Sequence, residues 1–358
     1  MTTNPTDELT EALKAIGKDE ELRVRFLALL RHAEVRLARP DFDVREQVTG
    51  PIVDALHQAI GPMHKQLASG IDFHFHYRSK IAREFVLAPD ARPDHVWEPQ
   101  TTRLLLQLGR KARQVLIGGA YSGDQAILLA REIRGHGGIV HCFEPNTQQM
   151  SMLRLNATAN GLDNLQFNQL GLWDRDHAML RLVGDDSFAH PEPAAPGAED
   201  GFATVTINGY GAAQRIEQLD LIMLDIEGAE LPALNGADRY LSQSKGRAPN
   251  IVFEVHRHYV DWSRGLDDTE ICRFLSGFGY HLFAVRDYQS NVPMGRQPIE
   301  LIRPEQTYLE GPPHGFNMLA VKDETILADP AFRFVSGVSP KLLRHRDPRL
   351  HQPQAGAA

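Results

Sequence analysis

Cysteine is scarce in this chain of 358 residues, which has only Cys142 and Cys272. The two lie far apart and form no CxxC pair, so we expect neither a disulfide framework nor a cysteine-built zinc site, and a reducing compartment is the natural one. Long apolar runs are missing too. No stretch approaches the ~18–20 residues that span a bilayer, and the N-terminus lacks the charged start and apolar core of a signal peptide. The sequence therefore predicts a cytoplasmic protein that makes no membrane contact.

An excess of positive charge is also absent. The chain carries 38 Lys and Arg against 46 Asp and Glu, which gives a formal net charge of -8. Because nucleic-acid-binding domains present basic surfaces, we expect no nucleic-acid partner. With 42% hydrophobic and 23% charged residues, the composition is that of an ordinary globular protein. The length fits one domain of roughly 200–250 residues with an accessory segment.

The first part of the chain has the spacing of helices. Apolar residues recur every three or four positions from about residue 7 to residue 67, which predicts amphipathic helices. We assign residues 1–95 to a helical accessory segment that covers the core, forms a lid over a substrate pocket, or pairs two subunits in a homodimer. Four aromatic residues in or next to this segment suit a partly apolar substrate and a domain interface equally: Phe73, Phe75, Tyr77 and Trp97.

Short apolar strands alternate with helices of about ten residues between residue 96 and residue 325. This alternation is typical of α/β proteins, in which helices cover both faces of a mostly parallel, doubly wound sheet. Residues 184–201, which read GDDSFAHPEPAAPGAEDG, predict a flexible insertion between two strands. We expect residues 326–358 to form a C-terminal extension that is partly disordered.

A glycine-rich turn follows the first apolar strand of this region. It reads Gly118-Gly119-Ala120-Tyr121-Ser122-Gly123-Asp124 and leads from the strand into a helix. Such a turn lets the backbone approach a ligand closely, although some glycine turns serve the chain reversal alone. The GK[ST] of a phosphate-binding P-loop is missing, which excludes that motif, and the missing GxGxxG argues against a nicotinamide-dependent reductase.

Acidic residues follow two later strands. Glu144 comes about 20 residues after the glycine turn, where a carboxylate can accept both ribose hydroxyls of an adenosine. Asp225, Glu227 and Glu230 follow the strand at 219–224. Clustered acids beside a cofactor can hold a cationic amino acid, bind a cation or accept a proton. Because parallel strands end at the same edge of a sheet, these groups predict an adenosine-containing cofactor there.

Three phrases together resemble the FkbM family of S-adenosylmethionine-dependent methyltransferases: FEP at 143–145, LDIEGAE at 224–230 and FEVH at 253–256. The resemblance covers about residues 95–322. It implies a Rossmann-like class I methyltransferase sheet and S-adenosylmethionine as the cofactor. It also implies methyl transfer to a hydroxyl of a small molecule, such as a secondary metabolite, a polyketide or a sugar, in natural product biosynthesis.

The resemblance also implies a set of contacts to the cofactor, some of which the residue patterns indicate independently. They are Glu98, Gly119, Ala120, Tyr121, Gly123, Glu144, Asn146 and Asp225. One position departs from the family, because Ile117 stands where family members usually carry an aspartate. Glu98, Gln100 or Thr101 could compensate for it.

Asp225, Glu254 and His256 are the predicted catalytic residues. His256 follows an apolar strand and faces the same rim as Asp225, and an imidazole suits the removal of a proton from a hydroxyl near neutral pH. Glu254 could orient it, whereas the plainer alternative is a structural histidine. In a metal-assisted alternative, Asp225, Glu254 and His256 hold a divalent cation that acidifies the hydroxyl. N-methylation of an amino sugar and a non-catalytic scaffold that keeps the cofactor fold remain open.

Overall fold

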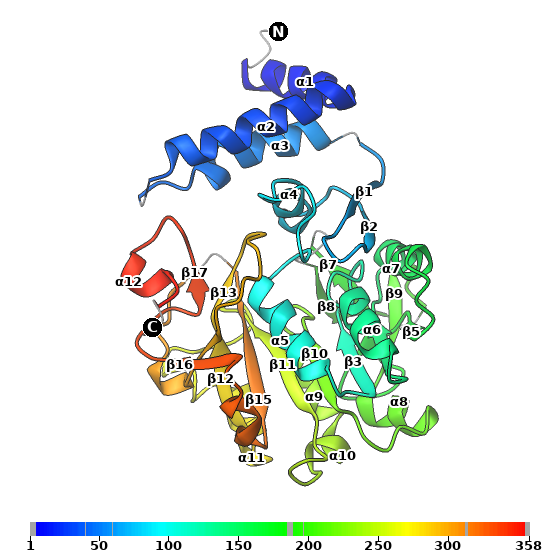
Figure 1. Ribbon diagram of the computed structural model, residues 1–358. Coiled ribbons are helices and arrows are strands. Elements are labelled where there is room, and N and C mark those ends of the chain that lie inside the picture. Colours follow the sequence, from blue (N-terminus) through cyan, green and yellow to red (C-terminus); the bar gives the residue numbers. More distant parts are fainter. Residues whose placement is uncertain are drawn as a thin grey trace.

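The computed structural model describes residues 5–39, 41–58, 60–184, 189–195, 197–311 and 314–354. It consists of an α/β body with a small helical part at one pole (Figure 1). None of the helices within these ranges is long and apolar enough to cross a membrane.

The body is built on a nine-stranded sheet with the order β16-β14-β12-β15-β11-β10-β3-β4-β5. Its first five strands along the chain run parallel, whereas β15 is antiparallel to both of its neighbours. The strands are β3 (Gln114–Gly118), β4 (Ile139–Phe143), β5 (Leu165–Asn168), β10 (Leu221–Leu224), β11 (Asn250–Val255), β12 (His281–Val285), β14 (Ile299–Ile302), β15 (Phe316–Val321) and β16 (Phe332–Val335). The chain proceeds outward from β3 to β5 and then returns to β10 on the other side of β3, which makes a topological switch point between β3 and β10.

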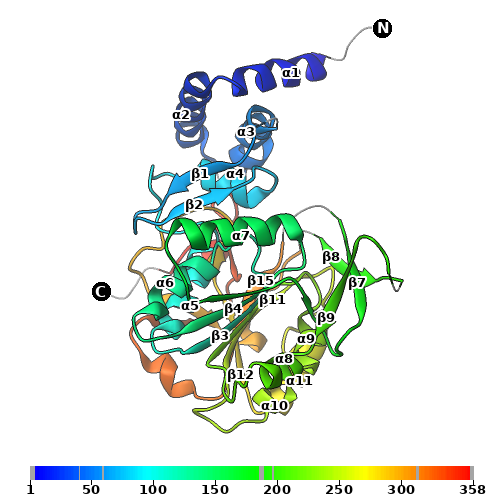
Figure 2. The ribbon, with the colours of Figure 1, turned by 90° about the vertical axis from the view of Figure 1, so that its right-hand side faces the viewer.

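Helices cover both faces of this sheet, which confirms the predicted doubly wound α/β fold (Figure 2). Successive side chains of a strand point to opposite faces. Leu221 and Met223 accordingly join one apolar core, while Ile222 and Leu224 join the other. The first core is covered by α5 (Pro99–Gly109), α6 (Ala126–Arg134) and α7 (Thr147–Ala159), and the second by α8 (Ile207–Ala213), α9 (Glu230–Asn235), α10 (Asp238–Leu241) and α11 (Glu270–Gly277).

The N-terminal segment is helical at its start and then forms a hairpin. Its elements are α1 (Pro5–Gly17), α2 (Glu20–Leu37), a π-helical turn (Arg45–Thr49), α3 (Gly50–His57), β1 (Met63–Gln66), β2 (Asp72–Phe75) and α4 (Lys80–Val86). Arg45 forms ion pairs with Glu34 of α2 and Glu84 of α4, both at 2.5 Å, and so ties α2 to α4. Residues 1–4, 40 and 59 of the predicted accessory segment lie outside the described residues.

A small second sheet is inserted between β5 and β10. It has the order β6-β9-β7-β8 and contains β6 (Gly171–Leu172), β7 (Met179–Val183), β8 (His190–Pro193) and β9 (Gly201–Val205). The segment predicted as a flexible insertion therefore contributes β8 and the first residue of β9 to regular structure. Its residues 185–188 and 196 lie outside the described part of the chain.

The segment predicted as a C-terminal extension continues the body. β16 pairs with β14 at the edge of the large sheet, and β17 (Lys341–Leu342) pairs with β13 (Asp287–Tyr288). A short helix, α12 (Pro348–His351), follows. Arg286 is fully buried and donates to the carbonyl oxygens of Ser339, Leu350 and Gln352, which fastens this segment to the sheet. Residues 355–358 lie outside the described residues.

Candidate active site

A cavity opens where β3, β4, β10 and β11 end, at the switch point of the large sheet. Ligands of doubly wound folds bind at this edge, because the loops there diverge to opposite faces. The cavity is lined by the glycine turn, the residues that follow β4, the residues that follow β10, the inserted β7–β9 sheet and parts of the N-terminal segment. It contains most of the residues that the sequence singles out.

The glycine turn packs directly against the end of β10. Gly119 has a φ of 75°, and a Cβ built on it would lie 1.8 Å from the carbonyl oxygen of Asp225. The backbone N–H groups of Gly119 and Ala120 both donate to the carbonyl of Phe143 at 3.0 Å, which joins the turn to the end of β4 as well. Only glycine satisfies this close approach, so the turn forms a wall of bare backbone.

Gly123 has a different role from Gly119. Its φ is 93°, and a Cβ on it would lie 2.5 Å from a methyl group of Leu153 on α7. The structure places Gly123 behind the cavity wall, whereas Gly119, Ala120 and Tyr121 line the cavity. The absence of a side chain at 123 allows the start of α6 to pack on α7.

Glu144 is held in one orientation on the cavity wall. One carboxylate oxygen accepts the N–H of Tyr121 at 2.9 Å, and the other accepts the N–H of Asn146 at 2.8 Å. Asn146 also lines the cavity, but its side-chain oxygen accepts the N–H groups of Gln148 and Gln149 and thereby caps α7. The structure thus uses the Asn146 side chain to begin the helix and the Glu144 carboxylate to face the cavity.

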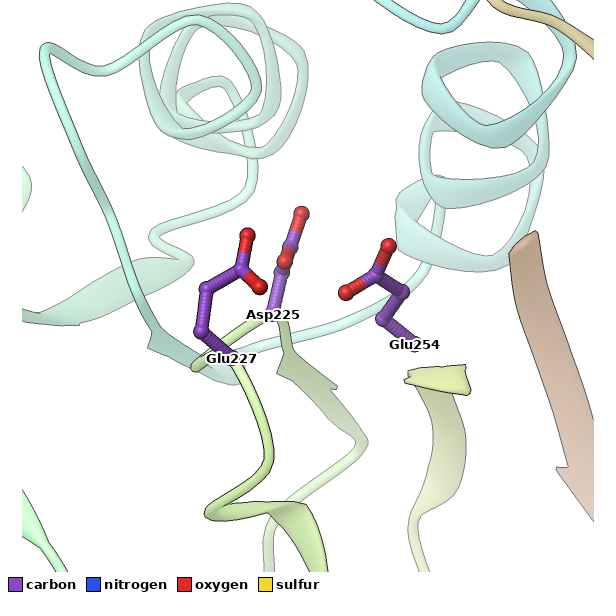
Figure 3. Close-up of side chains that lie close together, drawn as sticks. All are labelled: Asp225, Glu227 and Glu254. Atoms are coloured by element: carbon purple, nitrogen blue, oxygen red, sulfur yellow. The ribbon is translucent and has the colours of Figure 1, made fainter. Parts of the chain in front are cut away.

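Three carboxyl groups converge beside the glycine turn, as Figure 3 shows. They belong to Asp225 after β10, Glu227 in the following turn and Glu254 near the end of β11, and their oxygens lie within 4.8 Å of one another. Burial raises the pKa of Asp225 to about 6, and burial together with the charge of Asp225 raises the pKa of Glu227 to about 8. Burial and the neighbouring acids also raise the pKa of Glu254 well above its usual range.

Two further acids, Glu98 and Asp124, line the same cavity. The side-chain amide of Asn317 donates to Glu98 at 2.9 Å, which holds this carboxyl against the sheet. Burial, followed by the charge of Asp225, raises the pKa of both groups, that of Asp124 to about 7. Among the lining residues only Lys80 and His314 carry basic side chains, so the cavity is electrostatically suited to a cationic ligand.

Glu230 does not join the carboxyl cluster of the cavity. Its two oxygens accept the N–H groups of Ile226 at 2.9 Å and Gly228 at 3.0 Å, so this buried side chain closes the turn after β10. The closed turn holds Glu227 at a φ of 51°, a conformation that non-glycine residues rarely adopt. Glu230 is therefore a positioning residue for Glu227.

Four described non-glycine residues of the cavity adopt this left-handed conformation, which is unusual outside glycine. They are Glu98, Tyr121, Glu227 and His314, with φ values between 45° and 59°. Backbone strain of this kind collects where the surrounding structure must hold a side chain in a functional position. The distribution therefore supports the cavity as the functional site.

Ile117 lines the cavity at the end of β3, where the family usually has an aspartate. Of the three residues expected to compensate, only Glu98 reaches the cavity. The backbone N–H groups of Gln100 and Thr101 instead donate to the carboxylate of Asp287, at 2.9 and 2.6 Å, which satisfies the N-terminus of α5.

The structure does not bring His256 into the cavity. Its Nδ1 accepts the N–H of His258 at 3.1 Å, and the two imidazole rings stack with centroids 4.7 Å apart. Burial lowers the pKa of His256 to about 4, so the ring is neutral and Nε2 carries its proton. The group with metal-binding geometry accordingly contains Glu227 in place of His256. The histidine that lines the cavity is His314, which no sequence motif marks.

The β7–β9 sheet supplies an apolar wall of the same cavity. Leu180 is the register partner of Phe202, and Leu182 is the register partner of Pro191, so these four side chains share one face of the sheet. All four line the cavity, as does Trp97. Sequence reasoning missed this wall because the segment reads as an insertion without chemical motifs.

One family model matches part of the chain. Residues 118–282 match the family model described as the methyltransferase FkbM domain. No curated protein matches this chain to a significant degree.

Several solved structures are similar in part. The FkbM methyltransferase of Methylobacillus flagellatus shares 20% identity over 40% of this chain and 32% of that chain, with a TM-score of 0.28. A precorrin-6y C5,15-methyltransferase of Geobacter metallireducens shares 14% identity over 63% and 88%, with a TM-score of 0.35. An O-methyltransferase of Bacillus cereus in complex with SAH shares 16% identity over 63% and 80%, with a TM-score of 0.32. This chain thus spans about a third of the length of the FkbM protein that it matches.

Proposed function

We propose, on the premise that residues 118–282 carry a methyltransferase FkbM domain, that this protein is an S-adenosylmethionine-dependent O-methyltransferase. Its acceptor is a hydroxyl group of a small molecule, such as a secondary metabolite, a polyketide or a sugar. The observation that carries the proposal is the convergence of the glycine turn, Glu144 and Asp225 on one cavity at the switch point of the sheet.

The residues around the cavity fit this cofactor. Glu144 is oriented to accept hydrogen bonds from ribose hydroxyls, and Leu170 and Leu172 offer apolar surface for a purine ring. Asp225 supplies negative charge for the ammonium and sulfonium groups, and a bound cation would favour the ionised form of Glu98 beside it. The bare backbone at Gly119 leaves room for the ligand beside these groups.

Bound S-adenosylmethionine supplies an electrophilic methyl group on a positively charged sulfur. The protein's part in the transfer is to hold the acceptor oxygen in line with that methyl and to keep water away. Asp225 directly follows β10, Glu254 lies on the neighbouring strand β11, and the apolar residues of β7–β9 line the same cavity. This arrangement suits an acceptor with a hydroxyl at one end and an apolar body.

The acceptor hydroxyl must also lose its proton. We assign this step to the carboxyl cluster of Asp225, Glu227 and Glu254, because these groups line the cavity. His256 is less suited, since its Nδ1 already accepts a backbone N–H and its other nitrogen carries the proton. A divalent cation held by the same three carboxylates is the second candidate for activating the hydroxyl, because their oxygens lie within 4.8 Å of one another.

Two alternatives give different results in solution. An amino sugar acceptor would turn over in place of hydroxylated compounds, with methyl appearing on nitrogen. A scaffold protein would bind S-adenosylmethionine without turnover of any acceptor. Activity screens with hydroxyl and amine compounds therefore separate the three functions once the cofactor is shown to bind.

The first test is isothermal titration with S-adenosylmethionine and S-adenosylhomocysteine. We expect micromolar binding by the natural protein and a loss of about tenfold to a hundredfold in Glu144→Gln, because a hydrogen bond to a charged group contributes ~1.5–3 kcal/mol. Glu132→Gln, on the exposed face of α6, is the matched control and should bind normally. Titration of MgCl2 into protein saturated with S-adenosylhomocysteine tests whether the three carboxylates bind a divalent cation.

Protein that is folded by circular dichroism and binds neither ligand would contradict the methyltransferase proposal. Equal affinity in Glu144→Gln and Glu132→Gln would contradict the assigned ribose contact while leaving the cofactor in place.

A further inference from the structure

The helices α1, α2 and α3 form an arm at one pole of the molecule, which stands away from the large sheet in both views (Figures 1 and 2). The arm buries one side of α2 through Leu27 and Leu30. Most of the large hydrophobic side chains that are exposed in the described residues belong to the arm and the turn that leads into α3: Leu9, Leu22, Val24, Leu29, Val35, Leu37 and Val48.

Part of this apolar surface forms a continuous stripe along α2. The stripe consists of Leu22, Phe26, Leu29, Ala33 and Leu37, whose spacings of four, three, four and four residues place them on one helix face. Phe26 and Ala33 are half-buried, and Phe26 also packs against the core with its inner side, so the three leucines carry most of the exposed area. Leu22, Leu29 and Leu37 are 44%, 61% and 52% exposed. Water-exposed leucines in such a row are costly, since each buried large side chain contributes ~1.5–3 kcal/mol.

The stripe is complementary to a second copy of itself in antiparallel orientation. With a two-fold axis between residues 29 and 30, Leu22 faces Leu37 of the second copy, and the large Phe26 faces the small Ala33 of the second copy. The spacing matches that of helices that interlock along a shared seam. A two-fold contact of this kind uses the same surface on both copies and closes the assembly at two.

The charges of α2 favour the same orientation. Its first turn carries Glu20 and Glu21, and its last turn carries Arg36. An antiparallel pair brings each acidic start opposite the basic end of the other copy, and it also opposes the two helix dipoles favourably. Glu21 and Arg36 lie on the same flank of the stripe, so the pair would be formed twice, once on each side of the axis. Within one chain Glu21 pairs with Arg25 at 2.5 Å, and in the dimer Arg36 of the second copy joins this exposed pair.

We infer that the chain forms a homodimer through the stripe on α2, with the two helices antiparallel. The occupant of the apolar face is thus a second copy of this chain. The inference does not depend on the proposed methyltransferase activity, because it involves only the arm.

Sedimentation velocity of the full chain tests this dimer. Chain concentrations between roughly 1 and 100 μM cover micromolar dissociation constants. We expect a species of twice the 40.0 kDa chain mass in the natural protein. Leu29→Glu should give the monomer, because it places a charge at the centre of the stripe. Val35→Glu is the matched control: it introduces the same residue on the same helix, at a position that is 77% exposed and lies off the stripe, and the dimer should persist.

A charge exchange tests the orientation. Glu21→Arg should weaken the dimer by about threefold to tenfold, and Glu21→Arg combined with Arg36→Glu should restore it. Thermal unfolding of each monomeric variant shows that the arm has not simply unfolded. A monomeric natural protein at 100 μM, a dimer that survives Leu29→Glu, or loss of the dimer in both glutamate variants would overturn the inference.

Discussion

His141 is a buried histidine whose neighbours determine its protonation. It lies on β4, where Nε2 is 2.7 Å from the side-chain oxygen of Gln114 and Nδ1 is 2.8 Å from the hydroxyl of Tyr210. The amide oxygen only accepts, so Nε2 carries the proton and Nδ1 accepts from Tyr210. Burial lowers the pKa of His141 to about 4, which keeps the ring neutral in the folded protein at physiological pH.

This gives a prediction for stability against pH. Between pH 6.5 and pH 4 the unfolded chain binds a proton at His141 that the folded chain does not, so the contribution is complete above about pH 6.5 and is lost as the pH falls toward 4. The full contribution of His141 to the free energy of unfolding is about 3 kcal/mol. Urea unfolding gives the free energy of unfolding at pH 7.5 and at pH 5. The difference between these two values should be smaller in His141→Gln than in the natural protein. Equal differences would contradict the assignment.

At the scale of elements, the turn between β3 and α6 contacts the ends of both neighbouring strands, β4 and β10. Gly119 belongs to this turn, and Gly137, in the turn after α6, has nearly the same φ, 76° against 75°. A Cβ at 119 meets a carbonyl oxygen at 1.8 Å, whereas a Cβ at 137 meets nothing within 4 Å. The two positions therefore separate backbone strain from steric contact.

We expect Gly137→Ala to lower the free energy of unfolding by about 1–2 kcal/mol, because a non-glycine residue in the left-handed conformation is strained by about that amount. Gly119→Ala should cost at least about 2 kcal/mol more, because β3 and β10 must move apart. It should also abolish binding of S-adenosylhomocysteine, while Gly137→Ala binds normally. Chemical denaturation and titration measure the two effects, and similar losses of stability in both variants would contradict the steric argument.

At the scale of the whole molecule, the C-terminal segment is joined to the sheet through Arg286. This guanidinium is fully buried, forms an ion pair with Glu300 and donates to carbonyls of residues 339, 350 and 352. Removing one partner of a buried ion pair typically costs ~3–5 kcal/mol. Arg286→Met should lower the free energy of unfolding by about that amount and should expose residues 338–354 to proteolysis.

Arg349→Met is the control for this prediction. Arg349 pairs with Asp347 on the surface with 88% of its side chain exposed, and exposed pairs contribute little. We expect a change below about 0.5 kcal/mol and an unchanged proteolytic pattern. An Arg286→Met protein as stable as Arg349→Met would show that the C-terminal segment is held by its apolar contacts alone.

The sequence by itself determined the fold class and the edge of the sheet that carries the site. Alternating apolar strands and helices specify a covered parallel sheet, and the carboxyl ends of parallel strands meet at one edge. Glu144 and Asp225 could therefore be placed together without coordinates, because each directly follows a strand. The turn at Gly119 was recognisable for the same reason.

The tertiary structure decided which nearby side chains reach the cavity. His256 and Glu254 are two residues apart, yet only Glu254 lines the cavity, because the chain turns at the end of β11 and His256 stacks on His258 instead. Glu230 and Glu227 are three apart, yet one closes a turn and the other faces the ligand space. The wall from β7–β9 and His314 come from segments without motifs. Local pattern specifies where a strand ends, but the direction of a side chain beyond that end depends on contacts between segments distant in sequence.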